Sequence, residues 1–190
     1  MDKKEMVIKT ARKLFEEYGY KKVSMDELAK ESGVTKKTIY TYFKDKDAMF
    51  KYFIDEELNH MKTLVEQAKN NNKKFINQLS EGIYEVLCYR RKSKLFCNII
   101  RDFKYENSDK CTEFMNIYDN EIIKYIEFRI NEEIANKTIK PCNSHLSAFI
   151  IYKVYLSVLF EYDQIIDEKK VTKEIISILN DGLLNKKEDD

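Results

Sequence analysis

Residues 31–50 read ESGVTKKTIYTYFKDKDAMF, and this stretch decides how the first part of the chain folds. Gly33 can end one helix in a left-handed turn, and Thr35 can cap the next one. Within that next helix, Ile39 and Phe43 are four residues apart and predict a narrow buried face. At 100° per residue, the polar and aromatic side chains opposite fall within a sector of about 140°: Lys36, Lys37, Tyr40, Thr41 and Lys44. The sequence therefore predicts a short helix that is only half buried.

Further helices are predicted on both sides of this stretch. Apolar residues recur at helical spacing between residues 7 and 18, and Gly19 ends that helix. Ser24 followed by Glu27 has the spacing of a capping box and begins a second helix. Near the end of the stretch, Asp45 can cap a fourth helix, which continues without a breaker to about residue 68.

The composition of the whole chain favours helices throughout. The 190 residues include one proline and four glycines, too few for the turns of an all-β fold, and 43% are hydrophobic, enough for a substantial core. We predict an all-α fold of about nine helices, with an N-terminal three-helix helix-turn-helix module and a C-terminal helical bundle.

The sequence predicts a cytoplasmic protein. The opening residues, MDKKEMVIKTARKLF, are charged and amphipathic, unlike a secretory signal peptide. The longest apolar stretch, residues 148–160, has 13 residues and contains Lys153. It is too short to span a bilayer, so no membrane partner is expected. The cysteines contain no C-x-x-C pair and are expected to be reduced thiols: Cys88, Cys97, Cys111 and Cys142.

The last two predicted helices carry more apolar surface than one chain of this size covers. Residues 148–160 are apolar nearly all round, and residues 171–184 have one apolar side. We expect this pair to meet its symmetry mate in a homodimer, as a four-helix bundle. The alternative is that preceding helices of the same chain cover it. The predicted interface consists of Phe149, Leu156, Phe160, Ile175, Ile178, Leu179 and Leu183.

An enzyme is not expected, and no catalytic residue is assigned. The chain has two histidines, no glycine-rich phosphate loop and no Ser/His/acid motif. Cys142 and His145 have the C-x-x-H spacing of half a metal site, and His60 is the other histidine. Without a second ligand pair, neither a metal site nor a cofactor is predicted.

Charge is concentrated around the quoted stretch. The net charge is +1, but residues 33–46 carry four lysines and one acid, a local balance of 4 − 1 = +3. A basic patch on a nearly neutral protein indicates a specific anionic surface. A short capped helix, a glycine turn and a second short helix with outward polar residues are typical of a helix-turn-helix, whose second helix enters the DNA major groove. The alternative from the pattern alone is a solvated helical face.

Three motifs within residues 11–50 favour the helix-turn-helix over a solvated helical face. They are A-x-x-L-F-x-x-x-G-Y at Ala11–Tyr20, T/S-x-x-x-[IL]-A-x-x-x-G-V at Ser24–Val34, and x-x-x-[IL]-Y-x-Y/H-F-x-x-K ending at Lys46. In this order they closely resemble the N-terminal DNA-binding domain of the tetracycline-repressor (TetR/AcrR) family. The resemblance covers about a quarter of the chain.

The resemblance implies which residues contact DNA. They lie at the start of the second helix, on the third helix and at the start of the fourth: Met25, Thr35, Lys36, Lys37, Tyr40, Thr41, Tyr42 and Lys46. Our hypothesis assigns base reading to Lys36, Lys37 and Thr41. It assigns phosphate contacts to the remaining polar side chains, Thr35, Tyr40, Tyr42 and Lys46.

The resemblance also implies the organisation and the function of the whole chain. Residues 1–47 would form the DNA-binding domain, and residues 48–190 a ligand-sensing and dimerisation domain. The homodimer would bind a pseudo-palindromic double-stranded DNA operator, usually as a repressor that a small-molecule effector releases. The alternative is a DNA-bound scaffold of the same fold that a protein partner regulates.

The C-terminal half offers only a set of aromatic residues as a candidate effector pocket. These residues make an aromatic, fairly apolar effector plausible, although aromatic residues at helical spacing more often belong to a core. The candidates are Tyr84, Phe96, Phe103, Phe114, Tyr118, Tyr152 and Tyr155.

Overall fold

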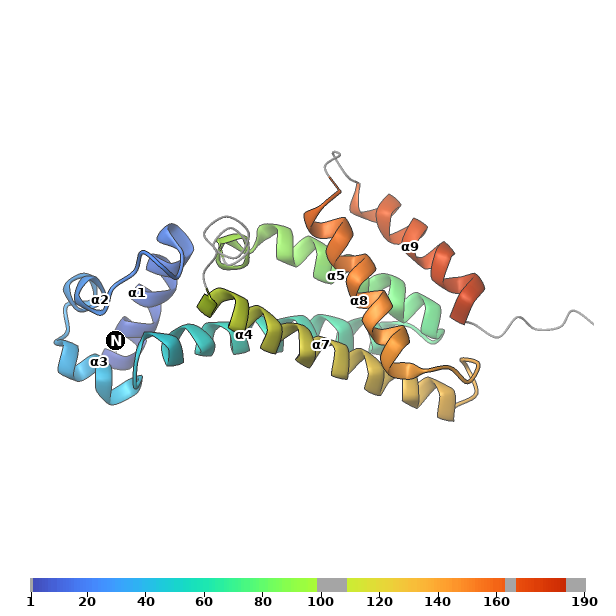
Figure 1. Cartoon of the computed structure of the whole chain (residues 1–190), viewed down its shortest axis with the longest axis horizontal. Coiled ribbons are helices and arrows are strands. Elements are labelled where there is room, and N and C mark those ends of the chain that lie inside the picture. The colour runs from blue at the N-terminus through green and yellow to red at the C-terminus, as the bar shows by residue number, and fades with distance from the viewer. Residues whose placement is uncertain (1, 99–108, 163–166, 184–190) are drawn as a thin grey trace, which may run out of the picture. The chain divides into compact units, whose positions relative to one another are not determined.

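The computed structural model describes residues 2–98, 109–162 and 167–183, and it confirms the predicted all-α fold (Figure 1). Residues 94–98 are also helical. The longer helices are α1 (Lys3–Tyr18), α2 (Met25–Ser32), α3 (Lys36–Tyr42), α4 (Lys46–Asn71), α5 (Phe75–Lys92), α7 (Asp109–Ala135), α8 (Ser144–Phe160) and α9 (Glu168–Leu183).

Local signals begin and end the N-terminal helices where the sequence predicts. Ser24 Oγ accepts a hydrogen bond from the backbone N–H of Glu27 at the start of α2. Gly33 ends α2 in the left-handed conformation, with φ at 69°, which favours glycine. Thr35 caps α3, and Asp45 Oδ1 accepts from the backbone N–H of Ala48 in the first turn of α4. The side chains of Ser24, Thr35 and Asp45 each satisfy a backbone donor that a helix start leaves without an intrahelical partner.

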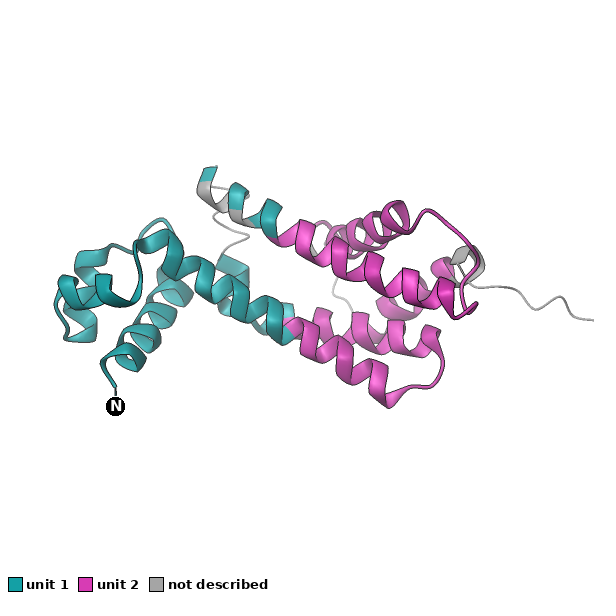
Figure 2. Cartoon of the chain, turned by 90° about the horizontal axis from the view of Figure 1, so that it is seen from below, with its two compact units in different colours: residues 1–60, 90–117 teal, residues 61–89, 118–190 magenta. Residues whose placement is uncertain are grey.

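Packing divides the chain into two compact units (Figure 2). Unit 1 comprises Met1–His60 and Arg90–Ile117, and unit 2 comprises Met61–Tyr89 and Tyr118–Asp190. The boundary predicted after residue 47 separates a DNA-binding domain from a ligand-sensing domain. The division into packing units does not test it, so it stays a prediction.

Unit 1 has an aromatic core that holds the three N-terminal helices together. Phe15 of α1 packs against Phe50 and Phe53 of α4, with ring centroids 5.1 and 5.9 Å apart. Leu28 of α2 and Ile39 of α3 are fully buried, and α1 contacts both of these helices. Because α3 is anchored through Ile39, its opposite face is left to solvent.

Unit 2 is a helical bundle whose core comes from α5, α7 and α8. The buried cluster consists of Leu87, Ile123, Ile130, Ala148, Ile151, Tyr152 and Tyr155. Among the described residues of unit 2, one charged side chain is buried: Arg129, whose guanidinium lies 3.3 Å from the Glu132 carboxylate and 3.7 Å from that of Glu133. Buried charges require such partners, because an isolated one is costly to remove from water.

Two negative findings apply to the described residues. None of their helices combines the length and the apolar character needed to cross a membrane. No group of three or more potential metal ligands occurs among them. Cys88, Cys97 and Cys142 are free thiols, and Cys97 is exposed.

Candidate nucleic-acid interface

The exposed face of α3 is built on two buried side chains. Ile39 is fully buried and Phe43 is 7% exposed, whereas Tyr40, between them in sequence, is 47% exposed. Thr35, Lys36, Lys37 and Thr41 are also exposed. Five of the predicted DNA-contacting residues are therefore exposed: four on α3 itself, and Thr35 at its N-cap, two residues after the left-handed Gly33.

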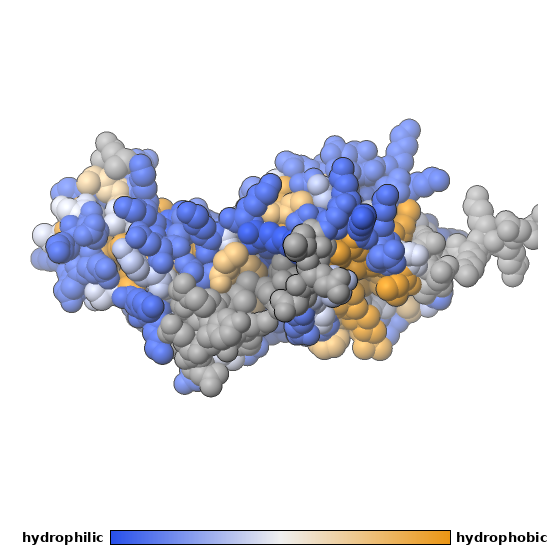
Figure 3. Space-filling view, turned by 90° about the horizontal axis from the view of Figure 1, so that it is seen from above, coloured by the Kyte–Doolittle hydropathy of each residue, from blue (hydrophilic) through white to orange (hydrophobic). Residues whose placement is uncertain are grey.

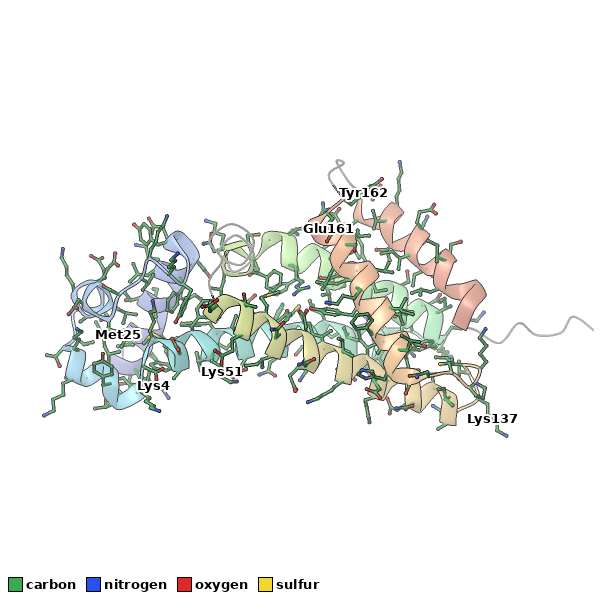
Figure 4. All side chains as sticks on the ribbon, in the orientation of Figure 1. Lys4, Met25, Lys51, Lys137, Glu161 and Tyr162 are labelled. Carbon is green, nitrogen blue, oxygen red and sulfur yellow. The ribbon has the colours of Figure 1, made fainter. Side chains whose placement is uncertain are left out.

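The remaining predicted contacts are half-buried. Met25 lies at the start of α2 (Figure 4), Tyr42 ends α3, and Lys46 begins α4. All three belong to unit 1, as α3 does. The starts of α2 and α4 also carry backbone N–H groups, which can bind phosphate oxygens.

Hydrogen bonds fix the threonines of α3. Thr35 Oγ1 accepts from the backbone N–H of Thr38 at 3.2 Å and lies 3.0 Å from Thr38 Oγ1. Thr41 Oγ1 donates to the carbonyl oxygen of Thr38 at 2.6 Å. With its proton used in this way, the Thr41 hydroxyl is oriented to accept a hydrogen bond from a partner, for example from the exocyclic amine of a base.

Lys36 is paired with Asp26 of α2. The Lys36 ammonium lies 2.8 Å from Asp26 Oδ1, and their side chains are 44% and 80% exposed. The hydrogen bond that Lys36 donates to Asp26 raises the pKa of Lys36 above its usual value. Exposed pairs of this kind contribute little to stability, so Lys36 can exchange this partner for DNA.

Lys46 points back to the connection between α1 and α2. Its Nζ donates to the carbonyl oxygens of Tyr20 and Val23, each at 3.1 Å. The same ammonium lies 4.2 Å from the centroid of the Tyr20 ring. The sequence pattern placed Lys46 among the phosphate contacts and gave no sign of these two carbonyls.

A second set of polar contacts holds α1 against other parts of unit 1, and the sequence pattern does not indicate it. Arg12 donates to Glu56 Oε2 at 2.7 Å and to Glu57 Oε1 at 3.2 Å. Glu57 is 3% exposed and also accepts from Ser93 Oγ at 2.9 Å. The Asn98 amide donates to two carbonyl oxygens in the last turn of α1, those of Phe15 and Glu16. These partners are far apart in sequence, so no local pattern could indicate them.

Of the predicted effector residues whose side chains the structure describes, four are buried, and the set draws on both units. Phe96 belongs to unit 1, where the Arg90 guanidinium lies 3.7 Å from its ring centroid. Tyr118, Tyr152 and Tyr155 are buried in unit 2, and Tyr84, also in unit 2, is half-buried. Phe103 and the side chain of Phe114 lie outside the described residues. This burial also fits the alternative that these aromatics are core residues.

Hydrogen bonds tie two of these tyrosines into the bundle. Tyr118 donates to the sulfur of Met61, at 3.2 Å, and Tyr152 donates to Asp119 Oδ1, at 2.6 Å. The rings of Tyr152 and Tyr155 are stacked, with centroids 6.2 Å apart. Buried tyrosine hydroxyls need such partners, so these contacts are those of a well-packed core.

The predicted dimer residues divide by exposure. Ile178 is 73% exposed and Phe149 is 42% exposed, whereas Ile175 is buried in the chain's own fold. Leu156 and Leu179 are partly buried against the core of unit 2. The side chains of Phe160 and Leu183 lie outside the described part of the chain.

Further apolar side chains are exposed on α8. Leu146 is 52% exposed and Ile150 is 47% exposed, and both lie within one turn of Phe149. Figure 3 shows hydrophobic side chains gathered on the surface of unit 2, while unit 1 is mostly hydrophilic in the same view. Exposed apolar side chains that cluster are typical of interaction surfaces.

Sequence comparison relates the chain to known regulators. The family described as "Bacterial regulatory proteins, tetR family" matches residues 7–53. An HTH-type transcriptional regulator of Staphylococcus aureus is 35% identical over 165 residues, which are 83% of this chain and 87% of that protein. The uncharacterized HTH-type transcriptional regulator YhgD of Bacillus subtilis is 29% identical over 164 residues, 86% of each chain.

Solved structures share the fold over nearly the whole chain. SmeT in complex with triclosan has a TM-score of 0.76 at 14% identity, covering 96% of this chain and 92% of that one. A Clostridium perfringens protein described as a fatty acid metabolism regulator has a TM-score of 0.66 at 24% identity, covering 95% and 100%. At these identities the likeness establishes the fold alone.

Proposed function

Because the chain belongs to the TetR family of bacterial transcriptional regulators, we propose that it is a repressor that binds a pseudo-palindromic DNA operator as a homodimer. The observation that carries the proposal is the face of α3, where Lys37, Tyr40 and Thr41 are exposed opposite the buried Ile39. Lysine and threonine can hydrogen-bond to base edges, and a tyrosine hydroxyl can donate to phosphate. The protein acts in the cytoplasm and has no catalytic role in this proposal.

The proposed effector is a small apolar or aromatic molecule bound by unit 2. Two observations support this class of ligand. SmeT, which shares the fold, is solved with triclosan bound, and another structural neighbour is named for fatty acid metabolism. Unit 2 has aromatic side chains in its interior, including Tyr118, Tyr152 and Tyr155. A ligand that prefers the conformation with low DNA affinity lowers operator occupancy by its difference in affinity for the two states.

The first experiment compares operator DNA with random DNA. The purified protein is titrated with the intergenic DNA upstream of its own gene and with a random duplex of equal length, at the same salt concentration. We expect tight, sequence-selective binding by a dimer, with the mass of the complex measured by light scattering. Equal affinity for both duplexes would contradict the proposal.

The second experiment addresses the effector. Once an operator fragment is defined, small apolar and aromatic molecules are screened for release of the protein from labelled DNA. We expect at least one class to lower DNA affinity at saturating concentration without unfolding the protein. If release occurs only with a protein fraction and never with small molecules, a protein partner regulates the chain instead.

A further inference from the structure

The connection between α1 and α2 is held from the start of α4. Two carbonyl oxygens of this connection, those of Tyr20 and Val23, accept hydrogen bonds from the same ammonium, Lys46 Nζ. A lysine ammonium has three donors, and here two of them are directed at the two sides of one turn. Lys46 therefore joins the chain entering the turn to the chain leaving it.

The Tyr20 side chain provides a second tether to the same helix. Its hydroxyl donates to Asp47 Oδ1, the residue after Lys46. Its ring is 7% exposed and lies between Phe15 and Phe50, with centroids 6.5 and 4.8 Å away. Thus Lys46 binds the backbone of the turn, and Asp47 binds the hydroxyl of its buried tyrosine.

The position of Lys46 in its helix supports a role in this turn. A cation in the first turn of a helix is disfavoured by the helix dipole, so α4 itself gains nothing from a lysine there. Carbonyl oxygens and an aromatic face are both favourable partners for an ammonium. Lys46 has both kinds of partner in the connection between α1 and α2.

The turn leads directly into a proposed DNA contact. Val23 is followed by Ser24, the cap of α2, and by Met25, the first residue of α2. We propose that Lys46 is a positioning residue: it sets the place of the α2 start on DNA by holding the preceding turn, and it does not neutralise a phosphate itself. This inference rests on the proposed function, because it concerns how the same surface meets DNA.

The test separates positioning from a phosphate contact by salt dependence. The Lys46→Met variant of the full chain keeps the length of the side chain and removes its charge. We expect its affinity for the operator fragment to fall about tenfold. A phosphate contact contributes about 0.9 to the slope of log affinity against log salt. We expect that slope to remain at the wild-type value; a decrease of about 0.9 would overturn the proposal.

Hydrogen exchange of the DNA-free protein gives a readout that does not depend on DNA. We expect residues 19–25 to exchange faster in Lys46→Met than in the wild type. Lys44→Met, which removes an exposed lysine two residues earlier, serves as the matched control and should leave exchange in this segment unchanged. Wild-type exchange in Lys46→Met would show that Lys46 does not hold the turn and would overturn the proposal.

Two further outcomes are informative. Faster exchange with unchanged operator affinity would assign Lys46 a purely structural role and would also overturn the proposal. If Lys46→Met does not fold, Tyr20→Phe removes the bond to Asp47 and leaves every lysine in place. Faster exchange of residues 19–25 together with a lower affinity in that variant supports positioning by the turn, and wild-type values of both contradict it.

The failure of this inference is distinct from a failure of the proposed function. If the wild-type protein binds operator and random DNA equally, the proposed function is wrong. The exchange measurement still decides whether Lys46 holds the turn.

Discussion

Lys37 is the side chain of α3 whose role is most directly testable. It is exposed on the face opposite Ile39, where it can reach a base edge. We expect Lys37→Ala to cost about 1 to 3 kcal/mol of operator affinity and to relax the preference at one base-pair position. The measurement is a set of titrations with operators that differ at single positions. Equal losses on operator and on random DNA would remove Lys37 from the base readers.

Arg12 stabilises the DNA-binding module through its contacts with α4. Its guanidinium binds the buried carboxylate of Glu57 and lies 5.1 Å from the centroid of the Phe53 ring. The Arg12→Ala change removes this ion pair, while the hydrogen bond from Ser93 to Glu57 remains. We expect Arg12→Ala to lower the free energy of unfolding by about 2 kcal/mol, less than for a fully buried pair because Arg12 is partly exposed.

Urea unfolding measures this effect, with Lys9→Ala as the matched control. Lys9 is an exposed lysine on the same helix. The two variants should differ clearly in midpoint at an equal slope. If Arg12→Ala is no less stable than Lys9→Ala, the ion pair with Glu57 does not stabilise this module.

At the level of the element, α3 depends on its cap more than a longer helix would. It has seven residues, and a short helix has few internal hydrogen bonds to offset the cost of nucleation. Thr35→Ala removes the oxygen that accepts from the backbone N–H of Thr38, and we expect a loss of about 1 kcal/mol. In a thermal melt this corresponds to about 2 to 4 °C. Thr35→Ser keeps the oxygen and should melt close to the wild type; an equal loss in both variants would rule out the cap as the cause.

The hydrogen bond between Tyr125 of α7 and Glu66 of α4 predicts that the stability of the fold depends on pH. Burial, and then the hydrogen bond to Glu66, raise the pKa of Tyr125 above its usual value of 10.0. The folded protein thus favours the neutral phenol. Below about pH 10 the group is neutral in both states, and above it the unfolded chain loses the proton first, so stability falls as pH rises.

The difference between wild type and Tyr125→Phe isolates this effect from the lysines and the other tyrosines. Free energies of unfolding are measured for both proteins between pH 8 and pH 11, on the order of the range in which a phenol titrates. We expect the stability of the wild type to fall more steeply above pH 10 than that of the variant. Parallel curves would contradict the assigned environment of Tyr125.

These elements also show how far the sequence predicts the fold. The caps at Ser24 and Thr35 and the turn at Gly33 were predictable because a cap is a contact between residues a few positions apart. The bonds from Asn98 to the end of α1 join residues more than 80 positions apart, and no periodicity encodes them.

Parts of the candidate site escaped prediction for the same reason. The exposed face of α3 follows from helical periodicity around Ile39 and Phe43. The two carbonyl partners of Lys46 do not, because they depend on where the connection between α1 and α2 lies against α4. Periodicity also gives an aromatic such as Tyr152 the same pattern whether it packs in a core or lines a ligand site.

For the whole molecule, we propose that a partner covers the exposed apolar side chains of α8 and α9. Ile178 is 73% exposed, and Leu146, Phe149 and Ile150 are each more than 40% exposed. A second copy of the chain is the partner that the proposed function needs, because two recognition helices must bind half-sites about 34 Å apart. Each copy would offer the same surface, as in a two-fold symmetric interface.

The last prediction concerns this dimer. Ile178→Asp places a charge on the most exposed of these side chains, and burying that charge in an interface is costly. We expect light scattering to give the mass of one chain, 22.8 kDa, where the wild type gives twice that value. Operator affinity should fall by more than tenfold, because two linked modules bind far more tightly than one. Asn131→Asp, an exposed residue of α7, is the control and should remain dimeric. If Ile178→Asp and Phe149→Asp both keep the dimer mass, the interface lies elsewhere, and the apolar surface of α8 and α9 serves another partner.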